Sequence, residues 1–373
     1  MPIQSPLLPD HFLTWTEPPD ENGDEVWRVV SWRRSVTLKG HSFREFARKV
    51  VPLLDGRHDL DGICDAVADT FAPGDLVSAL EMLAGQGIVV DAAPAEERGD
   101  TDPLARLLPQ MGWLAETAPE GRAAQRHLSG ARVVLFGAGG PGAVLARNLA
   151  AAGIGELLIV DGETVSATDP YFSALYRASD LGQPRATVLA AALATLAPDT
   201  RVAAHPARPR DRAAIAELLQ GAAMALCCLE SADLNLALKL NRACRDMGMR
   251  WLAGSLESLD LVVGPGFSGD PDAPCYLCWR MREVASAANP QARFALERHL
   301  DRLHSDLSGR RENLSVGADI VGGMMAAEVL AILTGAGEPM LDGRLLVIQL
   351  PGLHQDKHSV LRKPGCPVCG TGG

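Results

Sequence analysis

The first hundred residues combine two hydrophobic patterns. Residues 26–30 and 35–40 are rich in β-branched and apolar side chains, which predicts two short strands. Three segments with helical spacing and a final apolar run follow, at 41–56, 59–71, 73–86 and 87–90. This order predicts a small winged-helix-like α+β domain at 25–92. The proline- and acid-rich residues 1–24 predict an irregular N-terminus.

A different pattern begins after a predicted linker and entry helix at 93–130. An apolar strand runs into a glycine-rich turn and an alanine-rich helix, and a second apolar strand ends at Asp161. The turn has GxGxxG spacing and contains Gly137, Gly139, Gly140 and Gly142. Such a turn lets a phosphate approach a helix N-terminus, and the acid suits ribose hydroxyls. We therefore expect a Rossmann-like α/β domain at 131–373, with helices on both faces of its sheet.

Composition and charge narrow the possible partners. The 373 residues are 47% hydrophobic and carry a formal net charge of -11, which fits a soluble two-domain protein and disfavours a general nucleic-acid binder. Residues 58–92 hold seven acids and no Lys or Arg, so the third predicted helix is unsuited to a DNA groove. We find no signal-peptide pattern and no apolar run near the roughly 18 residues of a membrane span. A cytoplasmic location without a membrane partner is expected.

Four of the eight cysteines form two CxxC pairs, Cys275 with Cys278 and Cys366 with Cys369. In a reducing compartment two such pairs predict a tetrahedral zinc site. Because 87 residues separate the pairs, the metal would fasten the C-terminal tail to the body of the domain and play a structural role. The other cysteines are expected to be buried small apolar residues: Cys64, Cys227, Cys228 and Cys244.

The small domain offers a possible peptide-binding surface. An exposed edge strand can accept an extended peptide as a further strand, with peptide side chains entering apolar pockets beside a helix. The predicted peptide-binding residues are Ser35, Val36, Thr37 and Leu38 of the strand and Leu76, Ala79, Leu80 and Leu83 of the helix. The alternative is that these leucines pack the core of the domain. With its "PLLDG" and "QGIVV" segments, this region resembles the PqqD-like RiPP recognition element, which binds leader peptides of ribosomally made, modified peptides.

The rest of the chain resembles the ThiF/MoeB family, relatives of the ubiquitin-activating enzymes. The resemblance rests on "GAGGPGAVLARNL", "DLGQPRATVLAA", "PCYLCW", "SVGADIVGGMMAAEVL" and "CPVC" in this order. It implies an α/β ATP-binding fold, a homodimer, adenylation of a protein or peptide C-terminus, and structural zinc on the CxxC pairs. Asp161 matches the acid that holds the ribose, and Glu163 a common second acid.

Three departures fall on the phosphate and metal half of the family's site. Phe172 occupies the position of the phosphate-binding Arg, and Arg177 could replace that Arg only if the loop moved. Arg185 stands for the family's Lys, and Glu230 for its magnesium-binding Asp. We therefore expect no catalytic residues and no ATP turnover. The glycine turn, Asp161 and Arg185 are interpreted as vestigial nucleotide-binding residues.

Together the two parts resemble the ocin-ThiF-like, leader-peptide-binding partner of azol(in)e-forming cyclodehydratases, including those of thiopeptide pathways. The resemblance implies a scaffold that captures a precursor peptide and delivers it to a separate YcaO-type cyclodehydratase, which uses ATP to form azoline rings. Two alternatives remain open, a peptide-adenylating ThiF relative and, more remotely, an NAD-dependent oxidoreductase.

Overall fold

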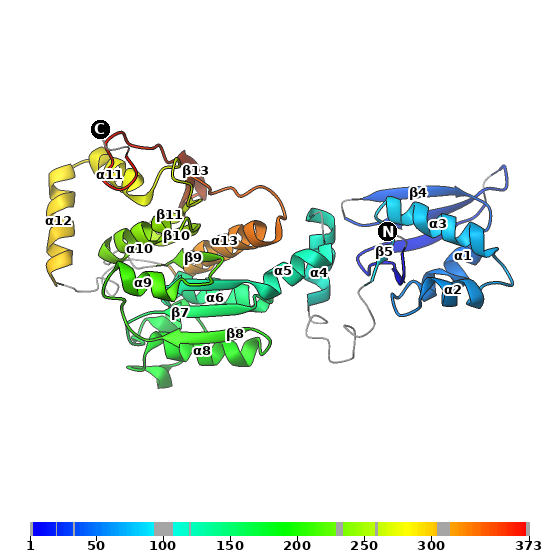
Figure 1. The fold of residues 1–373 in the computed structure, drawn as a ribbon, viewed down its shortest axis with the longest axis horizontal. Helices are drawn as coiled ribbons and strands as arrows, with labels where there is room; N and C mark the ends of the chain where they lie inside the picture. Colours follow the sequence, from blue (N-terminus) through cyan, green and yellow to red (C-terminus); the bar gives the residue numbers. More distant parts are fainter. Residues whose placement is uncertain are drawn as a thin grey trace. The chain divides into compact units, whose positions relative to one another are not determined.

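The computed structural model describes residues 3–19, 21–32, 34–92, 107–118, 121–228, 234–257, 260–303 and 314–370. The chain divides into two compact units, residues 1–116 and 117–373 (Figure 1). The boundary falls within residues 93–130, the predicted linker and entry helix.

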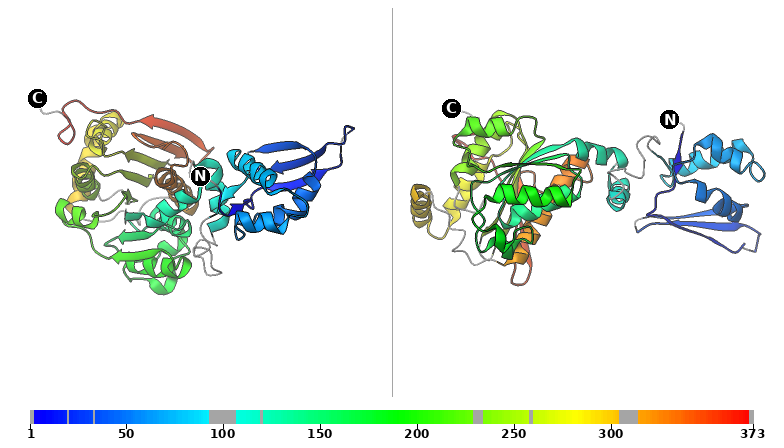
Figure 2. Two further views of the ribbon diagram at one scale, coloured as in Figure 1. Left: turned by 45° about the vertical axis from the view of Figure 1, so that its right-hand side comes forward. Right: turned by 90° about the horizontal axis from the view of Figure 1, so that it is seen from below.

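The smaller unit is a three-stranded antiparallel sheet with helices on one side (Figure 2). The sheet has the order β2-β3-β4, with β2 at Leu13–Glu17, β3 at Glu25–Val30 and β4 at Ser35–Gly40. The helices are α1 (Phe43–Lys49), η1 (Val51–Leu53), α2 (Leu60–Ala66) and α3 (Pro73–Gly85). A short pair, β1 (Pro6–Leu7) and β5 (Val90–Asp91), closes the unit. The predicted order of two strands, helices and a final strand is confirmed.

The prediction of an irregular N-terminus at residues 1–24 is wrong. Both β1 and β2 lie there, and β2 pairs along its whole length with β3. The Arg28 guanidinium donates to the Glu17 carboxylate at 2.9 Å. The acidic side chain at the end of β2 is thus paired with a cation on the neighbouring strand. The apolar alternation of Leu13 and Trp15 was too short to stand out between prolines.

The larger unit contains an eight-stranded mixed sheet of order β13-β12-β11-β10-β9-β6-β7-β8. Its parallel strands are β6 (Arg132–Phe136), β7 (Glu156–Val160), β8 (Arg201–His205), β9 (Met224–Cys227) and β10 (Trp251–Glu257). The antiparallel strands are β11 (Asp260–Phe267), β12 (Arg344–Gln349) and β13 (His354–Ser359).

Alternate residues of the central strands pack into two separate hydrophobic cores, one on each face of the sheet. In β6, Val133 and Leu135 pack with helices on one face, and Val134 and Phe136 pack with helices on the other. The helices of the first face include α6 (Gly140–Ala151), α8 (Arg185–Leu196) and α13 (Ser315–Thr334). Those of the second include α9 (Arg212–Leu218), α10 (Leu234–Asp246) and α11 (Tyr276–Ser286). The predicted α/β fold with helices on both faces is confirmed (Figure 2).

The described residues contain further helices, one of which adds Leu128 to the first core. They are α4 (Leu108–Thr117), α5 (Gly121–Gly130), α7 (Asp169–Phe172), η4 (Ala178–Asp180) and α12 (Pro290–Leu303).

Helix α13 corrects one expectation from the sequence. By length and composition alone this helix is apolar enough to cross a membrane, so the expectation that the chain holds no such segment is wrong. In the structure, however, α13 packs against α6, β10 and β11. Gly322 allows this packing, because a Cβ at that position would lie 2.6 Å from the carbonyl oxygen of Pro141. The helix is therefore a packed element of the α/β unit.

Candidate functional site

The four predicted turn glycines lie together where β6 ends and α6 begins. Gly137 has a φ of 95°, a conformation that glycine adopts without strain. Gly139 is the residue before α6, and Gly140 is its first residue. A Cβ on Gly142 would lie only 2.0 Å from the carbonyl oxygen of Gly137, so the turn closes only around a glycine. A glycine turn of this kind before a helix N-terminus is typical of phosphate-binding turns.

Asp161 follows β7 and faces the same turn. Its side chain is buried, and its two oxygens accept the backbone N–H groups of Ala138 and Glu163, each at 2.7 Å. Burial raises the pKa of Asp161 above its ordinary value, although these two N–H groups and Arg185 oppose the shift. A carboxylate oxygen has more than one lone pair, so each Asp161 oxygen keeps the capacity to accept a further hydrogen bond.

An aromatic side chain packs against the start of α6 at Gly140. Phe172 ends the short helix α7, and a Cβ on Gly140 would lie 3.1 Å from the Phe172 Cβ and 3.2 Å from its Cγ. The Tyr171 ring stands edge-on to the Phe172 ring, with centroids 5.2 Å apart. The Cβ of Ala318, in α13, would also lie 3.1 Å from a Cβ on Gly140. An apolar contact thus lies beside the first turn of α6.

Arg185, the other predicted cation, is held in a buried ion pair. Its Nε lies 3.1 Å from Asp169 Oδ2, and both side chains are at most 5% exposed. The same Asp169 oxygen accepts the backbone N–H of Ser166 at 2.6 Å and its hydroxyl at 2.8 Å. Sequence reasoning missed Asp169. Its only signal was an acid three residues after a serine at the start of a short helix.

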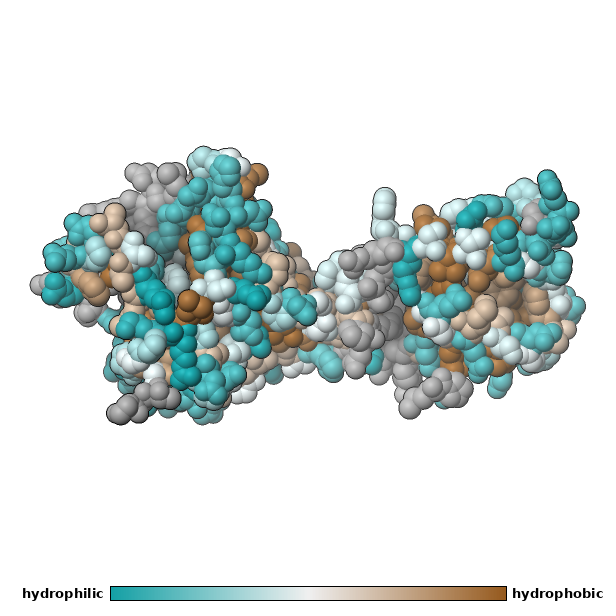
Figure 3. All heavy atoms as spheres, turned by 90° about the horizontal axis from the view of Figure 1, so that it is seen from above, coloured by the Kyte–Doolittle hydropathy of each residue, from teal (hydrophilic) through white to brown (hydrophobic). Residues whose placement is uncertain are grey.

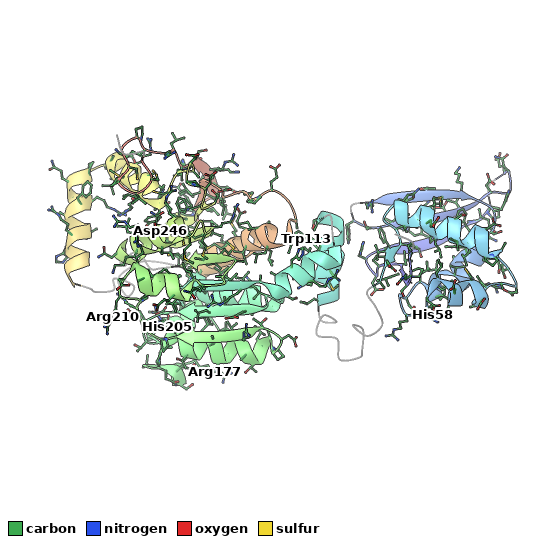
Figure 4. The ribbon with its side chains drawn as sticks, viewed as in Figure 1. His58, Trp113, Arg177, His205, Arg210 and Asp246 are labelled. Atoms are coloured by element: carbon green, nitrogen blue, oxygen red, sulfur yellow. The ribbon has the colours of Figure 1, made fainter. Side chains whose placement is uncertain are left out.

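The residues around Asp161 also make contacts with one another. Glu163 pairs with Arg208, and the Arg208 side chain covers Gly162, since a Cβ there would lie 2.6 Å from Arg208 Cγ. The Tyr176 hydroxyl donates to the carbonyl oxygen of Ala138 at 2.5 Å. Arg177, the possible substitute for the phosphate Arg, lies at the surface of the larger unit (Figure 4). Glu230 lies outside the described residues.

All four predicted metal ligands come together at one point. The sulfur atoms of Cys275, Cys278, Cys366 and Cys369 lie within 4.8 Å of one another, and all four residues are buried. Cys275 Sγ lies 3.9 Å from Cys278 Sγ and 3.8 Å from Cys366 Sγ. Tetrahedral zinc with Zn–S bonds of about 2.3 Å requires sulfur atoms about 3.8 Å apart. The cluster can therefore hold a metal ion such as zinc.

The other cysteines behave as expected from the sequence. Within the described residues they are all buried and lie among apolar side chains: Cys64, Cys227, Cys228 and Cys244.

In the smaller unit, β4 is an edge of the described sheet. Its side chains alternate, with Ser35 and Thr37 exposed and Val36 and Leu38 half-buried against the core. The Ser31 N–H donates to the Arg34 carbonyl at 2.8 Å, which makes this a hydrogen-bonded pair of the β3–β4 hairpin. The alternation of an antiparallel ladder then directs the N–H and C=O groups of residues 35, 37 and 39 to the free edge.

The predicted helix residues lie mostly inside the unit. Leu76, Leu80 and Leu83 are at most 1% exposed and pack with Trp27 and Ile63 in its core. The expectation that these leucines present an accessible face is therefore wrong, and the alternative of core packing holds. Helical spacing shows only that residues share a face, and here that face meets the sheet. Ala79 is half-buried. Apolar atoms remain visible on one face of the smaller unit (Figure 3).

Comparisons with known proteins agree with this architecture. The model of the ThiF family matches residues 110–368. The SAMP-activating enzyme E1 of Haloferax volcanii is 30% identical over 258 residues, 69% of this chain and 86% of that protein. The sulfur carrier protein adenylyltransferase of Thermus thermophilus is 31% identical over 268 residues, 71% of this chain and 88% of that protein.

Solved structures share the fold at lower identity. E. coli MccB with MccA-N7isoASN has a TM-score of 0.65 at 16% identity, and the match covers 98% of this chain and 100% of that chain. PaaA has a TM-score of 0.62 at 19% identity, with 77% and 92% covered. The family model and the two relatives together settle the classification. The chain belongs to the ThiF family.

Proposed function

We propose that this chain is a peptide-binding scaffold. Its smaller unit captures the leader of a ribosomal precursor peptide, and a separate YcaO-type enzyme uses ATP to form azoline rings on that peptide. The observation that carries the proposal is the phosphate side of the glycine turn. There Phe172 packs against Gly140, and Arg185 is neutralised by Asp169.

Adenylyl transfer needs cations on the charge that develops at the phosphates. Loss of one such donor typically lowers the rate by about two to three decades. Phe172 supplies no donor. Freeing Arg185 would leave Asp169 buried without its counter-ion, and breaking such a pair typically costs about 3–5 kcal/mol. Both cationic positions of the family's pattern are thus poorly suited to the reaction.

Peptide capture is supported by the free edge of β4 and by a protein that this chain matches over nearly its whole length. MccB has been solved in complex with N-formylated MccA, and that match covers 98% of this chain. A strand added to β4 would gain main-chain hydrogen bonds from residues 35, 37 and 39. Tethering the leader also raises the local concentration of the core peptide at the partner enzyme, so a modest affinity suffices.

Further parts of the proposal concern the metal and the assembly. We assign structural zinc to the four-cysteine cluster, because Cys275 Sγ lies 3.9 Å from Cys278 Sγ and 3.8 Å from Cys366 Sγ, close to the spacing of a tetrahedral zinc site. The family resemblance adds a homodimer, and the acidic composition argues against nucleic acid as a partner. A cytoplasmic location follows from the expected pairing of reduced cysteines with zinc.

The second candidate is a peptide-adenylating enzyme. It is favoured by the intact glycine turn, by the position of Asp161 beside that turn, and by relatives named adenylyltransferases. Its activity would show as exchange of labelled pyrophosphate into ATP.

One experiment separates the two candidates. Fluorescein-labelled leader peptides of precursors encoded beside this gene are titrated with the full chain, and binding is followed by fluorescence anisotropy. Thr37→Pro removes an edge N–H while the β3–β4 ladder stays intact, so it should abolish binding, and Thr37→Val is the matched control that keeps the N–H. Pyrophosphate exchange is measured on the same samples. Peptide binding without exchange supports the scaffold, whereas exchange that is lost in Asp161→Ala supports the adenylating enzyme.

A further inference from the structure

At the hairpin end of β4, Arg34 contacts Gly87, which lies two residues after the end of α3. Arg34 Nη1 donates to the carbonyl oxygen of Gly87 at 3.4 Å, and the whole guanidinium lies over that glycine. A Cβ at Gly87 would lie 3.0 Å from Nη1, 3.6 Å from Nη2 and 3.8 Å from Cζ. Because a guanidinium carries five N–H donors and this bond is long, Arg34 keeps donors for a ligand.

The strand period fixes the face on which Arg34 lies. Successive side chains of a strand alternate, so Arg34, Val36 and Leu38 point to the helix side of the sheet. Val36 and Leu38 pack there against the core and stay half-exposed. Lys39 points to the opposite face. An extended segment added to β4 would therefore place alternate side chains beside two apolar residues and then beside a guanidinium.

The charge of the neighbouring helices makes the Arg34 end of β4 selective for acidic side chains. Residues 58–92, which include α2 and α3, contain seven acids and no Lys or Arg. On α3 itself, Asp75 and Glu81 are exposed. An acidic side chain bound beside α3 is thus repelled by the acids of that helix, and Arg34 is a cation that can attract it.

We propose that Arg34 determines the specificity of peptide binding by receiving a carboxylate at one end of the segment that pairs with β4. The inference rests on the proposed peptide-binding function. It defines the ligand as an extended segment with a single acid followed, or preceded, at two and four residues by apolar side chains. The acid lies opposite Arg34, and the apolar residues lie opposite Val36 and Leu38, with Cβ atoms about 4.5–5.5 Å apart across the strands.

A display library of random twelve-residue peptides tests this pattern. The library is selected on the immobilised full chain, on Arg34→Gln, on Arg34→Glu and on Lys39→Gln. The wild type should enrich the acid-x-apolar-x-apolar pattern or its reverse. Arg34→Gln should lose the acid but keep the apolar residues, and Arg34→Glu should select Lys or Arg in its place. Lys39→Gln removes the same charge on the other face of the strand, so it should keep the acid.

The outcomes distinguish this inference from the function on which it rests. Enrichment of alternating peptides without an acid, or an acid that persists in Arg34→Gln, overturns the role of Arg34 and leaves peptide binding in place. Absence of any enrichment over Thr37→Pro overturns peptide binding itself, and the inference with it. For one selected peptide, Glu→Gln at the acid should weaken binding to the wild type by about two- to fivefold, as an exposed ion pair does, and leave binding to Arg34→Gln unchanged.

Discussion

The buried pair of Asp169 and Arg185 gives the sharpest prediction for the larger unit. The side chains are at most 5% exposed, their N–O distance is 3.1 Å, and Asp169 also accepts two bonds from Ser166. Arg185→Met leaves the carboxylate buried without its cation, and Asp169→Leu leaves the guanidinium without its anion. Each change should lower the free energy of unfolding of the larger unit by about 3–5 kcal/mol. For a domain of this size that corresponds to a melting temperature lower by about 6–20 °C.

The double variant makes the prediction specific to the pair. With both charges of the pair gone, neither partner is left unpaired, so Asp169→Leu with Arg185→Met should be closer to the wild type than the sum of the single changes. Differential scanning calorimetry measures the stability of all three variants. Hydrogen exchange of the Ser166 amide, which donates to Asp169, reports whether the loop opens locally. If the two single effects simply add in the double variant, the reasoning that the charges depend on each other is refuted.

Three further predictions concern packing, pH and metal. Gly322→Ala should destabilise the chain by about 1–3 kcal/mol in urea unfolding, because its Cβ would lie 2.6 Å from the carbonyl oxygen of Pro141. Gly323→Ala, whose nearest atom is 4.0 Å away, is the matched control and should stabilise the helix by up to about 1 kcal/mol. Burial raises the pKa of Glu156, but hydrogen bonds from two arginines outweigh it and hold the pKa below 4.5. The stability that Glu156 adds is therefore present at neutral pH, and the deficit of Glu156→Gln in thermal melts should shrink as the pH falls below 4.5. Elemental analysis should find about one zinc ion per chain and much less in Cys369→Ser, while Cys64→Ser, outside the cluster, should keep the metal; equal zinc in both variants would contradict the assignment.

Features encoded by local chemistry could be predicted from the sequence. The turn glycines follow from spacing alone, because the strand, turn and helix are contiguous. The cysteine cluster followed from ligand type, since four thiols in two CxxC pairs have few other uses in a reducing compartment. The cluster could be predicted although its two cysteine pairs lie far apart in the chain.

Features that depend on tertiary contact could not be predicted in the same way. The position of Phe172 was identified as unusual, but its contact with Gly140 depends on how α7 folds back over the turn. Asp169 was missed because nothing in its neighbourhood marks it as the partner of Arg185, sixteen residues later. The core position of Leu80 and the strand at Leu13–Glu17 required knowledge of which surfaces the sheet covers.

The positions of the four cysteines in the chain determine when the cluster can form during translation. Its first pair leaves the ribosome with Cys278, and its last ligand, Cys369, follows 91 residues later. At about 5–20 residues per second the nascent chain carries an incomplete site for roughly 5–18 seconds. A chain that stops anywhere before Cys366 lacks both ligands that close the cluster. The cluster can therefore close only after translation has passed Cys369.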